Sequence, residues 1–247
     1  MSDKIQTLAN LHKPGDPLLL FNIWDAGSAQ IVARAGAKAI ATGSLSVAGA
    51  QGFEDGEKLP LSFAQTNASH IASAVDIPVT VDLETGYGAE PTAVGESALL
   101  MKAVGVAGLN VEDQNLSAGG LRSPADQEKR LKAAADTGLF INARTDLFIQ
   151  TAIADHDEKL VTDAFERCQF YADAGARSFF VPFLSDEKLI GLLCDKSPLP
   201  VNIMKMPDML SVAQLAALGV ARISYGPGPW RAAMEAFEAE AQQIYRN

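Results

Sequence analysis

The sequence predicts a single-domain (β/α)8 barrel, a TIM barrel of the α/β class, and three observations support this prediction. First, short apolar runs typical of buried strands alternate with segments of helical periodicity, and eight such pairs follow one another along the chain. Second, no linker or low-complexity segment interrupts them, so we expect residues 1–247 to form one domain. Third, a length of 247 residues is typical of this barrel. The alternative is a doubly wound open sheet, which usually has fewer strands and a glycine motif that residues 25–28 match only weakly.

The predicted strands are apolar runs rich in β-branched and aromatic residues and bounded by turn-forming residues. In chain order they cover residues 18–24, 39–43, a third run that starts at residue 78, 108–113, 139–146, 178–183, 200–205 and 222–226. The helices predicted after them cover residues 28–35, 62–74, 91–104, a segment from residue 123, 157–174, 186–194, 211–218 and 229–245. Two long loops are also predicted, a glycine-rich one at residues 44–60 and a polar one at residues 114–122.

Start and stop signals support these helices. Glycine directly follows three of them, at Gly36, Gly175 and Gly219, where it readily adopts the left-handed conformation of a helix cap. Proline opens two others, at Pro91 and Pro229. The N–H groups of the first helical turn have no partner within the helix, so proline, which lacks an N–H, costs no hydrogen bond there.

The composition argues against several classes of function. A formal net charge of −10 and an isoelectric point near 4.8 argue against a nucleic-acid-binding surface, and an anionic ligand must be attracted by local cations. No apolar run reaches the roughly 18 residues of a membrane-spanning helix, and the N-terminus has no signal-peptide pattern. We therefore expect a cytoplasmic protein with no membrane partner. Cys168 and Cys194 lie in helical patterns and are expected to be reduced thiols in the core, the alternatives being a disulfide or a nucleophile.

Polar residues accumulate where the predicted strands end. The active site of such a barrel lies at the carboxyl ends of its strands, so these residues are the candidates for it. They are Asn22, Trp24, Asp25, Thr42, Gly43, Ser44, Asp82, Glu84, Glu112, Asp113, Arg144, Asp146, Asn202, Lys205 and Ser224. His12, His70 and His156 fall elsewhere, and we expect them at the surface.

Acidic residues at the ends of the third and fourth strands predict a metal site. Asp82 and Glu84 share a face if the strand continues through Glu84, and they then repel unless a cation lies between them; alternatively, Glu84 already belongs to the following turn. Glu112 follows from the next strand, and the absence of Cys and His favours Mg²⁺, with Mn²⁺ as the alternative ion. Because Mg²⁺ usually keeps waters, Asp82 as the direct ligand, with Glu84 and Glu112 holding coordinated water, is an ordinary arrangement.

Arg144 lies among these acids and offers a planar fork that suits a carboxylate or a phosphate. The alternative is a structural ion pair with Glu112 or Asp146. The backbone N–H groups of residues 42–45 can bind an oxyanion, although a turn of such small residues can also serve packing alone.

Five motifs, in their order and approximate spacing, resemble the isocitrate lyase and phosphoenolpyruvate mutase superfamily. They are Asn22-Ile23-Trp24-Asp25-Ala26-Gly27-Ser28-Ala29, Gly52-Phe53-Glu54-Asp55, Asp82-Leu83-Glu84-Thr85-Gly86-Tyr87-Gly88, Gly108-Leu109-Asn110-Val111-Glu112-Asp113 and Asn142-Ala143-Arg144-Thr145-Asp146. The resemblance extends from Leu18 to about Tyr225. It implies a (β/α)8 barrel, usually oligomeric, with Mg²⁺ beside a small anionic 2-oxo acid or its enolate.

The resemblance also implies roles for single residues. Asp82 is expected to bind the metal directly, and Glu84 and Glu112 to bind it through water. Asp55 is expected to be a metal-shell or catalytic carboxylate on a mobile loop, and Arg144 the clamp for the anion. Ser44 and Leu45 are expected to hold the substrate carboxylate. The other strand-end residues expected to bind substrate are Trp24, Thr42, Gly43 and Asn202.

The loop at residues 114–122 departs from the specialised branches of that superfamily. Isocitrate and 2-methylisocitrate lyases carry a Lys-Lys-Cys-Gly-His segment there. Phosphoenolpyruvate mutase and phosphonopyruvate hydrolase carry Lys-Thr-Asn-Ser, and a histidine near the end of the sixth strand. This chain has no cysteine or lysine in the loop and has Pro182-Phe183 at the end of the sixth strand. Tyr87 is then the nearest candidate for the proton donor. Arg122 is a candidate for binding a distal carboxylate of the substrate, and a solvated loop arginine is the alternative.

We therefore expect a Mg²⁺-dependent enzyme that cleaves a C–C bond in a small 2-oxo or 2-hydroxy dicarboxylate through an enolate, by retro-aldol cleavage or decarboxylation. The alternatives are a P–C bond enzyme acting on phosphonopyruvate and a non-catalytic barrel that binds 2-oxo acids. A homo-oligomer, either a dimer or a tetramer, is expected. An apolar stripe on the last helix suits packing on its own barrel or on a neighbour's, while an exchange that needs a longer tail is not expected. The stripe consists of Trp230, Met234, Phe237 and Ala241.

Overall fold

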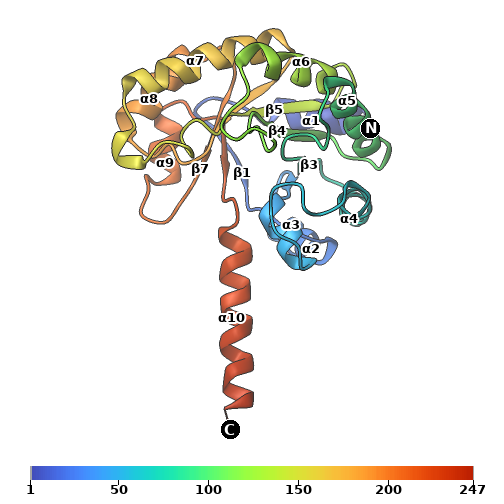
Figure 1. Cartoon of the computed structure of the whole chain (residues 1–247). Coiled ribbons are helices and arrows are strands. Elements are labelled where there is room, and N and C mark those ends of the chain that lie inside the picture. Colours follow the sequence, from blue (N-terminus) through green and yellow to red (C-terminus); the bar gives the residue numbers. More distant parts are fainter. Residues whose placement is uncertain (1, 247) are drawn as a thin grey trace.

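The computed structural model describes residues 2–246 and confirms the predicted barrel. Eight parallel strands form one sheet in the order β1-β8-β7-β6-β5-β4-β3-β2, with β1 and β2 at its two edges. Just beyond these strands an isolated parallel bridge joins Ile23 to Thr42 and brings the edges together. The sheet is therefore a nearly closed barrel, and most of the helices pack around it (Figure 1).

The strands are shorter than predicted, but each lies within its predicted run. They are β1 Leu18–Leu20, β2 Ile40–Ala41, β3 Val79–Asp82, β4 Gly108–Glu112, β5 Phe140–Arg144, β6 Ser178–Val181, β7 Val201–Met204 and β8 Arg222–Ser224. The helices are α1 Ser2–Asn10, α2 Ala26–Arg34, α3 Ser44–Ala50, α4 Leu61–Ala74, α5 Pro91–Ala103, α6 Pro124–Ala135, α7 Glu158–Asp173, α8 Glu187–Lys196, α9 Val212–Ala217 and α10 Gly228–Tyr245, with a 3₁₀ turn, η1, at Ile153–Asp155.

Capping side chains fix where several helices begin. Asp25 and Ser28 form a capping box at the start of α2, so this segment is a helix cap and not the phosphate motif of an open sheet. Four more helices begin at a side chain that accepts the backbone N–H three residues later. These caps are Ser123, Asp157, Asp186 and Ser211.

Two helices lie where none was predicted. α3 occupies the first part of the segment expected to be a loop, because small residues such as Ala and Gly hide the helical periodicity of Ser44–Ala50. α1 precedes the barrel and buries Leu8 against β4, where a side chain on Gly108 would lie 2.8 Å from the Leu8 Cδ2 atom. His12 follows α1, and its expected surface position was wrong, because its ring is buried and stacks on Phe140 at 4.4 Å.

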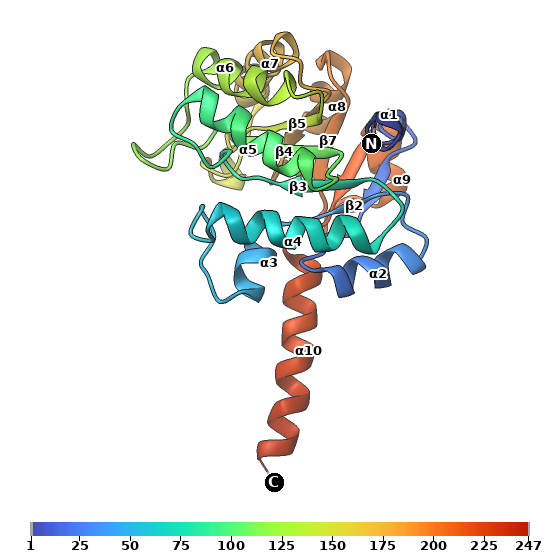
Figure 2. The same cartoon turned by 90° about the vertical axis from the view of Figure 1, so that its right-hand side faces the viewer.

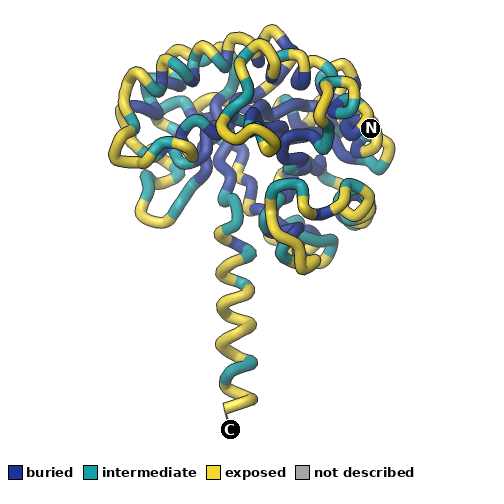
Figure 3. The backbone as a smooth tube through the Cα atoms, in the orientation of Figure 1, coloured by how far each residue is buried: buried dark blue, intermediate teal, exposed yellow. Residues whose placement is uncertain are grey.

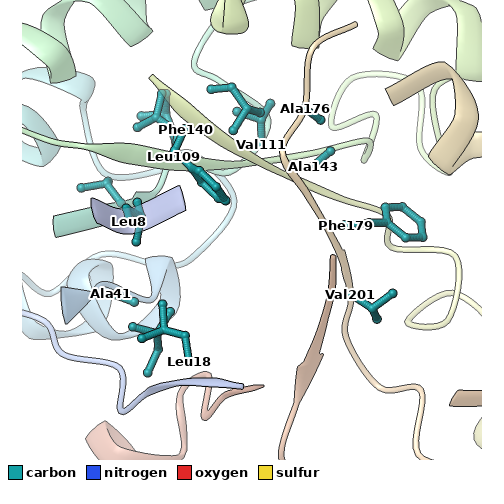
Figure 4. Close-up of a cluster of buried hydrophobic side chains, with 14 of the residues drawn as sticks. Leu8, Leu18, Ala41, Leu109, Val111, Phe140, Ala143, Ala176, Phe179 and Val201 are labelled. Carbon is teal, nitrogen blue, oxygen red and sulfur yellow. The ribbon is translucent and has the colours of Figure 1, made fainter. Parts of the chain in front are cut away.

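The apolar core lies mainly between the barrel and the helices. Figure 4 shows part of it, with Leu109 and Val111 of β4 near Phe140 and Ala143 of β5. The inside of the barrel, in contrast, holds a hydrogen-bonded polar layer. The amide nitrogen of Asn142 donates to the side-chain oxygens of Asn110 at 2.8 Å and Asn202 at 3.0 Å.

The last helix, α10, leaves the barrel and does not pack on it. In both Figure 1 and Figure 2 it extends away from the body of the molecule, and Figure 3 shows it as largely exposed. Phe237, Ile244 and Tyr245 are 72%, 70% and 87% exposed. Within residues 2–246, no helix is both long and apolar enough to cross a membrane. Cys168 and Cys194 are free thiols, as expected.

Candidate active site

A cavity of about 510 Å³ opens at the carboxyl ends of the strands. This volume lies within the range of sites that bind small molecules. Five carboxylates line it, from β3 and β4, from the loop after α3 and from the segments that follow β3 and β5: Asp55, Asp82, Glu84, Glu112 and Asp146. Arg144 lines it as well, so the predicted acids and the predicted arginine do converge on one site.

Glu84 reaches the cavity from the turn after β3, which was the alternative to a strand that continues through Glu84. β3 ends at Asp82, and Glu84 has a φ of 53°, so the two acids are not successive residues on one strand face. Tyr87 also has a φ of 53°, and its hydroxyl donates to Glu84 Oε1 at 3.0 Å. Left-handed backbone at residues other than glycine is costly, and it is characteristic of sites whose geometry the surroundings impose.

Arg144 is the centre of an ionic network. Its Nη1 atom lies 2.7 Å from Glu112 Oε2 and 4.0 Å from Asp82 Oδ2. Its Nε and Nη2 atoms donate to the two oxygens of Asp146, at 2.6 and 3.0 Å. The structural ion pairs are therefore present, and one N–H on each Nη atom remains for a ligand. Burial opposes the charge on Arg144, but the three acids outweigh it and raise its pKa, so the guanidinium stays charged.

Glu57 ties the loop after α3 to the turn after β3. Its backbone N–H donates to Glu84 Oε2 at 2.5 Å, and its Oε1 atom accepts from the Thr85 hydroxyl at 2.6 Å and from the Tyr87 N–H at 2.8 Å. Glu57 itself has a φ of 58°. Because Asp55 is two residues away on the same loop, these contacts also position Asp55 at the cavity.

Arg130 of α6 holds the same turn from the other side. Its guanidinium is buried and donates to the carbonyl oxygens of Thr85 and Gly88, each at 2.7 Å, and of Ala89 at 2.8 Å. The turn after β3 is thus fixed between a carboxylate and a guanidinium, neither of which the motif itself contains.

The acids are crowded and poorly solvated. Burial, opposed in part by the Glu57 N–H, raises the pKa of Glu84 to about 7. Burial and the charge of Asp82 raise the pKa of Asp55, and burial raises that of Glu112 although Arg144 opposes it. Crowded, buried carboxylates repel one another unless some are protonated or a cation lies between them.

The acidic residues fit a hard divalent cation bound partly through water. The Oδ1 atom of Asp82 is buried and has no hydrogen-bond partner in the described structure. Buried polar atoms normally have a partner, so this oxygen is free to bind an ion. Among residues 2–246 no group of three or more His, Cys, Asp or Glu side chains is arranged so that it could hold a metal ion. The fit therefore depends on the unused Oδ1 atom of Asp82 as one direct ligand, with Glu84 and Glu112 holding water, because Mg²⁺ usually keeps waters.

The predicted substrate-binding residues divide into two groups. Gly43, Ser44 and Leu45 line the cavity at the start of α3, although the Ser44 N–H donates to Asp82 Oδ2 at 3.2 Å in this structure. Arg144, the predicted anion clamp, lines it too, whereas Trp24, Thr42 and Asn202 lie away from it. Trp24 packs beside α3 against the small cluster around Val47, and its carbonyl accepts from Asn67.

Thr42, Tyr87 and Asn202 also lie away from the main cavity. Thr42 and Tyr87 line a much smaller neighbouring pocket, so Tyr87 orients Glu84 and does not face the main cavity. Asn202 is fully buried inside the barrel, because β7 ends two residues later, and its amide donates to Ser224 Oγ at 3.2 Å. The inward side chains of a barrel strand reach the site only near its last residue.

Asp113, a strand-end acid, has a structural role. Its carboxylate accepts from Thr145 Oγ1, the Asp146 N–H and the Tyr171 hydroxyl at 2.7, 2.9 and 2.7 Å, and lies 3.0 Å from Arg167 Nη1. It thereby holds Asp146 against Arg144.

Sequence reasoning missed Glu57, Arg130 and Arg231 as residues of this region. Glu57 could have been considered, because it lies two residues after Asp55 in a glycine-containing loop. Nothing in the local pattern of the predicted helices around Arg130 and Arg231 distinguishes them from surface residues.

Both the sequence and the structure of this chain are similar to those of known proteins. The sequence model of the phosphoenolpyruvate phosphomutase family matches residues 8–245. A crystal structure from Burkholderia cenocepacia J2315, described provisionally as a phosphonomutase, is similar with a TM-score of 0.95 and 45% identity, over 98% of this chain and 98% of that one. An uncharacterised Mycobacterium tuberculosis H37Rv protein is 34% identical over 95% of this chain and 87% of its own length. The 2-methylisocitrate lyase of Escherichia coli K12 is 27% identical over 93% of this chain and 83% of its own length.

Proposed function

The chain belongs to the phosphoenolpyruvate phosphomutase family, and from this premise we propose that it is a Mg²⁺-dependent lyase. Its substrate would be a small 2-oxo or 2-hydroxy dicarboxylate, in which it breaks a C–C bond by retro-aldol cleavage or decarboxylation. The observation that carries the proposal is the unpartnered Asp82 Oδ1 atom beside Glu84, Glu112 and Arg144 in one cavity. Proteins similar to this chain include both a lyase and a phosphomutase, so the family supports an enzyme whichever of the two reactions it catalyses.

Asp82 would hold Mg²⁺ directly, with Glu84 and Glu112 binding it through water; Mn²⁺ is the alternative ion. The ion would supply positive charge next to the oxygen on which negative charge develops. Arg144, kept charged by its three acids, offers its two remaining N–H groups to the same oxyanion or to the substrate carboxylate.

In a retro-aldol reaction of a 2-hydroxy dicarboxylate, the bond between the carbinol carbon C2 and C3 breaks. C2 loses its hydroxyl proton and becomes the carbonyl carbon of a 2-oxo acid, while C3 keeps the electron pair, which its own carboxylate stabilises as an enolate. In a 4-hydroxy-2-oxo acid the C3–C4 bond breaks instead, C4 becomes the new carbonyl carbon and the C2 carbonyl group stabilises the pair. The hydroxyl proton needs a base, and Asp55, a cavity carboxylate whose pKa is raised by burial, is our candidate. The enolate then takes a proton, and we keep Tyr87 as the candidate source, acting through Glu84, to whose Oε1 atom its hydroxyl donates at 3.0 Å.

The second candidate is a P–C bond enzyme acting on phosphonopyruvate. The family description and the 45% identical Burkholderia protein favour it. We rank it lower because Pro182 and Phe183 line the cavity at the end of β6, where the resemblance to P–C enzymes leads us to expect a histidine.

The test measures pyruvate release in the presence of Mg²⁺ from oxaloacetate, a citramalate-like acid, a 2-methylisocitrate-like acid and phosphonopyruvate. We expect turnover of at least one C–C substrate and none of phosphonopyruvate. Turnover of phosphonopyruvate alone would establish the second candidate. Binding of 2-oxo acids without any turnover would establish a non-catalytic barrel.

The metal assignment has its own test. We expect Mg²⁺ to raise the melting temperature of the wild-type protein and Asp82→Asn to abolish this rise, because the variant loses the direct ligand. Asp16→Asn, an exposed position outside the cavity, is the matched control and should keep the wild-type response. An unchanged response in Asp82→Asn would overturn the assignment.

A further inference from the structure

Two cationic residues line the side of the cavity formed by the last two strands and α10. Lys205 directly follows β7, and Arg231 lies in the first turn of α10. Four of the five carboxylates of the cavity come from β3 and β4 or from the segments after β3 and β5, and the fifth, Asp55, comes from the loop after α3. The cavity therefore has an acidic side and a basic side.

The protein's own acids leave these two cations unpaired. Arg231 makes no side-chain hydrogen bond or ion pair within residues 2–246, and Lys205 Nζ makes one long hydrogen bond, of 3.4 Å, to the Met209 carbonyl. Arg144 in the same cavity is paired with three acids. In a chain of net charge −10, two free cations on one cavity wall are available to an anionic ligand.

The position of Arg231 is fixed by its neighbour. The Trp230 ring packs so closely on Gly49 of α3 that a Cβ atom at residue 49 would lie 2.8 Å from it. The first turn of α10 is thus anchored beside the cavity although the rest of the helix extends away. Arg122, the loop residue that sequence reasoning offered for a distal carboxylate, is not among the residues that line the cavity.

β6 lies between β5 and β7, and therefore between the acidic and the basic side, and both its Phe180 and the following Phe183 line the cavity. Ile149, Met204 and Met206 add further apolar side chains to the lining. A ligand that reaches from one side to the other therefore needs an apolar carbon segment in its middle.

We propose that Lys205 and Arg231 form a binding subsite for a second anionic group. The substrate would then be a diacid whose 2-oxo or 2-hydroxy carboxylate lies on the acidic, metal-binding side and whose distal carboxylate lies on the basic side. Its middle would be an aliphatic segment against the apolar wall. This inference rests on the proposed function, which supplies the orientation of the 2-oxo acid end.

Binding is measured by calorimetry with Mg²⁺ present, using pairs of ligands that differ only in the distal carboxylate. The pairs are 2-oxoglutarate with 2-oxopentanoate, and 2-oxoadipate with 2-oxohexanoate, and oxalate serves as a probe of the metal side alone. We expect at least one diacid to bind about tenfold or more tightly than its monoacid counterpart, since a charge-assisted hydrogen bond is worth at least this factor. Phosphonopyruvate is included to learn whether a phosphonate is preferred to a carboxylate.

The variants Lys205→Met and Arg231→Met, singly and together, keep most of the side-chain volume and remove the charge. We expect them to reduce the diacid-to-monoacid affinity ratio, toward one in the double variant, while oxalate binds as it does to the wild type. Lys38→Met, an exposed lysine that does not line the cavity, should keep the wild-type ratio.

The outcomes separate this inference from the proposed function. If oxalate and the 2-oxo acids bind with Mg²⁺ but diacids have no advantage, or the double variant keeps it, the subsite is disproved and the metal site stands. If neither oxalate nor any 2-oxo acid binds in the presence of Mg²⁺, the proposed function fails and the subsite fails with it.

Discussion

At the scale of single residues, burial determines what a side chain can do. His12 was expected at the surface but is 6% exposed, with Nδ1 2.7 Å from the Leu8 carbonyl and with no hydrogen-bond partner for Nε2 among residues 2–246. Burial, together with the charge of Arg222, lowers its pKa from the ordinary value of 6.5 to about 3. The folded protein therefore keeps this imidazole neutral at pH values where the unfolded chain protonates it.

This difference predicts a dependence of stability on pH. Because the unfolded state binds the proton first, the contribution of His12 is complete above about pH 6.5 and is lost as the pH falls toward 3. We expect the free energy of unfolding to fall by about 1.4 kcal/mol per pH unit in this window relative to His12→Phe, which keeps an aromatic ring but cannot titrate. Chemical denaturation at pH 7, 6 and 5 measures it. His70→Gln, at an exposed position, should follow the wild type; parallel curves for the wild type and His12→Phe would contradict the prediction.

At the scale of elements, the turn after β3 depends on residues far away in the sequence. Three of its carbonyl groups accept from Arg130 of α6, and its Thr85 hydroxyl and Tyr87 N–H donate to Glu57. These contacts hold Glu84 and Tyr87 in left-handed backbone conformations. The geometry of the candidate metal site therefore depends on α6 as well as on the barrel.

Replacing Arg130 should destabilise this element. Arg130→Met leaves three carbonyl groups without their donor, and we expect a loss of about 3 kcal/mol or more in the free energy of unfolding. We also expect weaker Mg²⁺ binding by calorimetry, because Glu84 is no longer held in place. Lys129→Met changes the adjacent residue of α6, whose side chain is 68% exposed, and should alter neither quantity. Normal Mg²⁺ affinity in a folded Arg130→Met protein would show that the turn keeps its shape without α6.

The order of strands and helices could be predicted from the sequence, whereas the shape of the turn after β3 could not. The eight βα units were predictable because alternating apolar runs, helix caps and glycine stops are local signals. The convergence of Asp82, Glu112 and Arg144 was predictable as well, because parallel strands place their carboxyl ends together. The left-handed turn at Glu84 was not, because it is imposed by Glu57 and Arg130, and no local pattern in the sequence pairs these residues with the turn.

Side-chain positions near strand ends were predicted least well. Asn202 and Ser224 were both considered strand-end residues, but only Ser224 lines the cavity, since β8 ends there and β7 continues past Asn202. A difference of two residues in a strand end decides between the barrel interior and the site. Such boundaries depend on tertiary pairing and are not fixed by local composition.

At the scale of the whole molecule, α10 leaves part of the barrel uncovered. Leu19 and Phe21, in and just after β1, are 44% and 50% exposed, although strands of a parallel barrel are normally covered by helices. On α10 itself, Phe237 and Ile244 are exposed as well. One chain thus presents two unpaired apolar surfaces, which a second copy can cover reciprocally by exchanging the helix. Of the apolar stripe on this helix, Trp230 packs on α3 of its own chain, whereas Met234 and Phe237 are exposed.

We expect a homo-oligomer, a dimer or a tetramer, in which α10 contacts a second copy. Light scattering over a range of protein concentrations measures its molar mass in solution. Phe237→Glu places a charge in the middle of the exposed apolar stripe, and we expect it to shift the mass toward that of one chain, because burying an unpaired carboxylate is costly. Glu238→Gln removes a charge from the next residue, which is exposed, and should leave the mass unchanged. If the wild-type protein has the mass of a single chain at all concentrations, or if Phe237→Glu associates as the wild type does, α10 is not the contact between copies. The Trp230 anchor on α3 would then hold α10 beside the cavity in the isolated chain, and Arg231 would depend on no second copy.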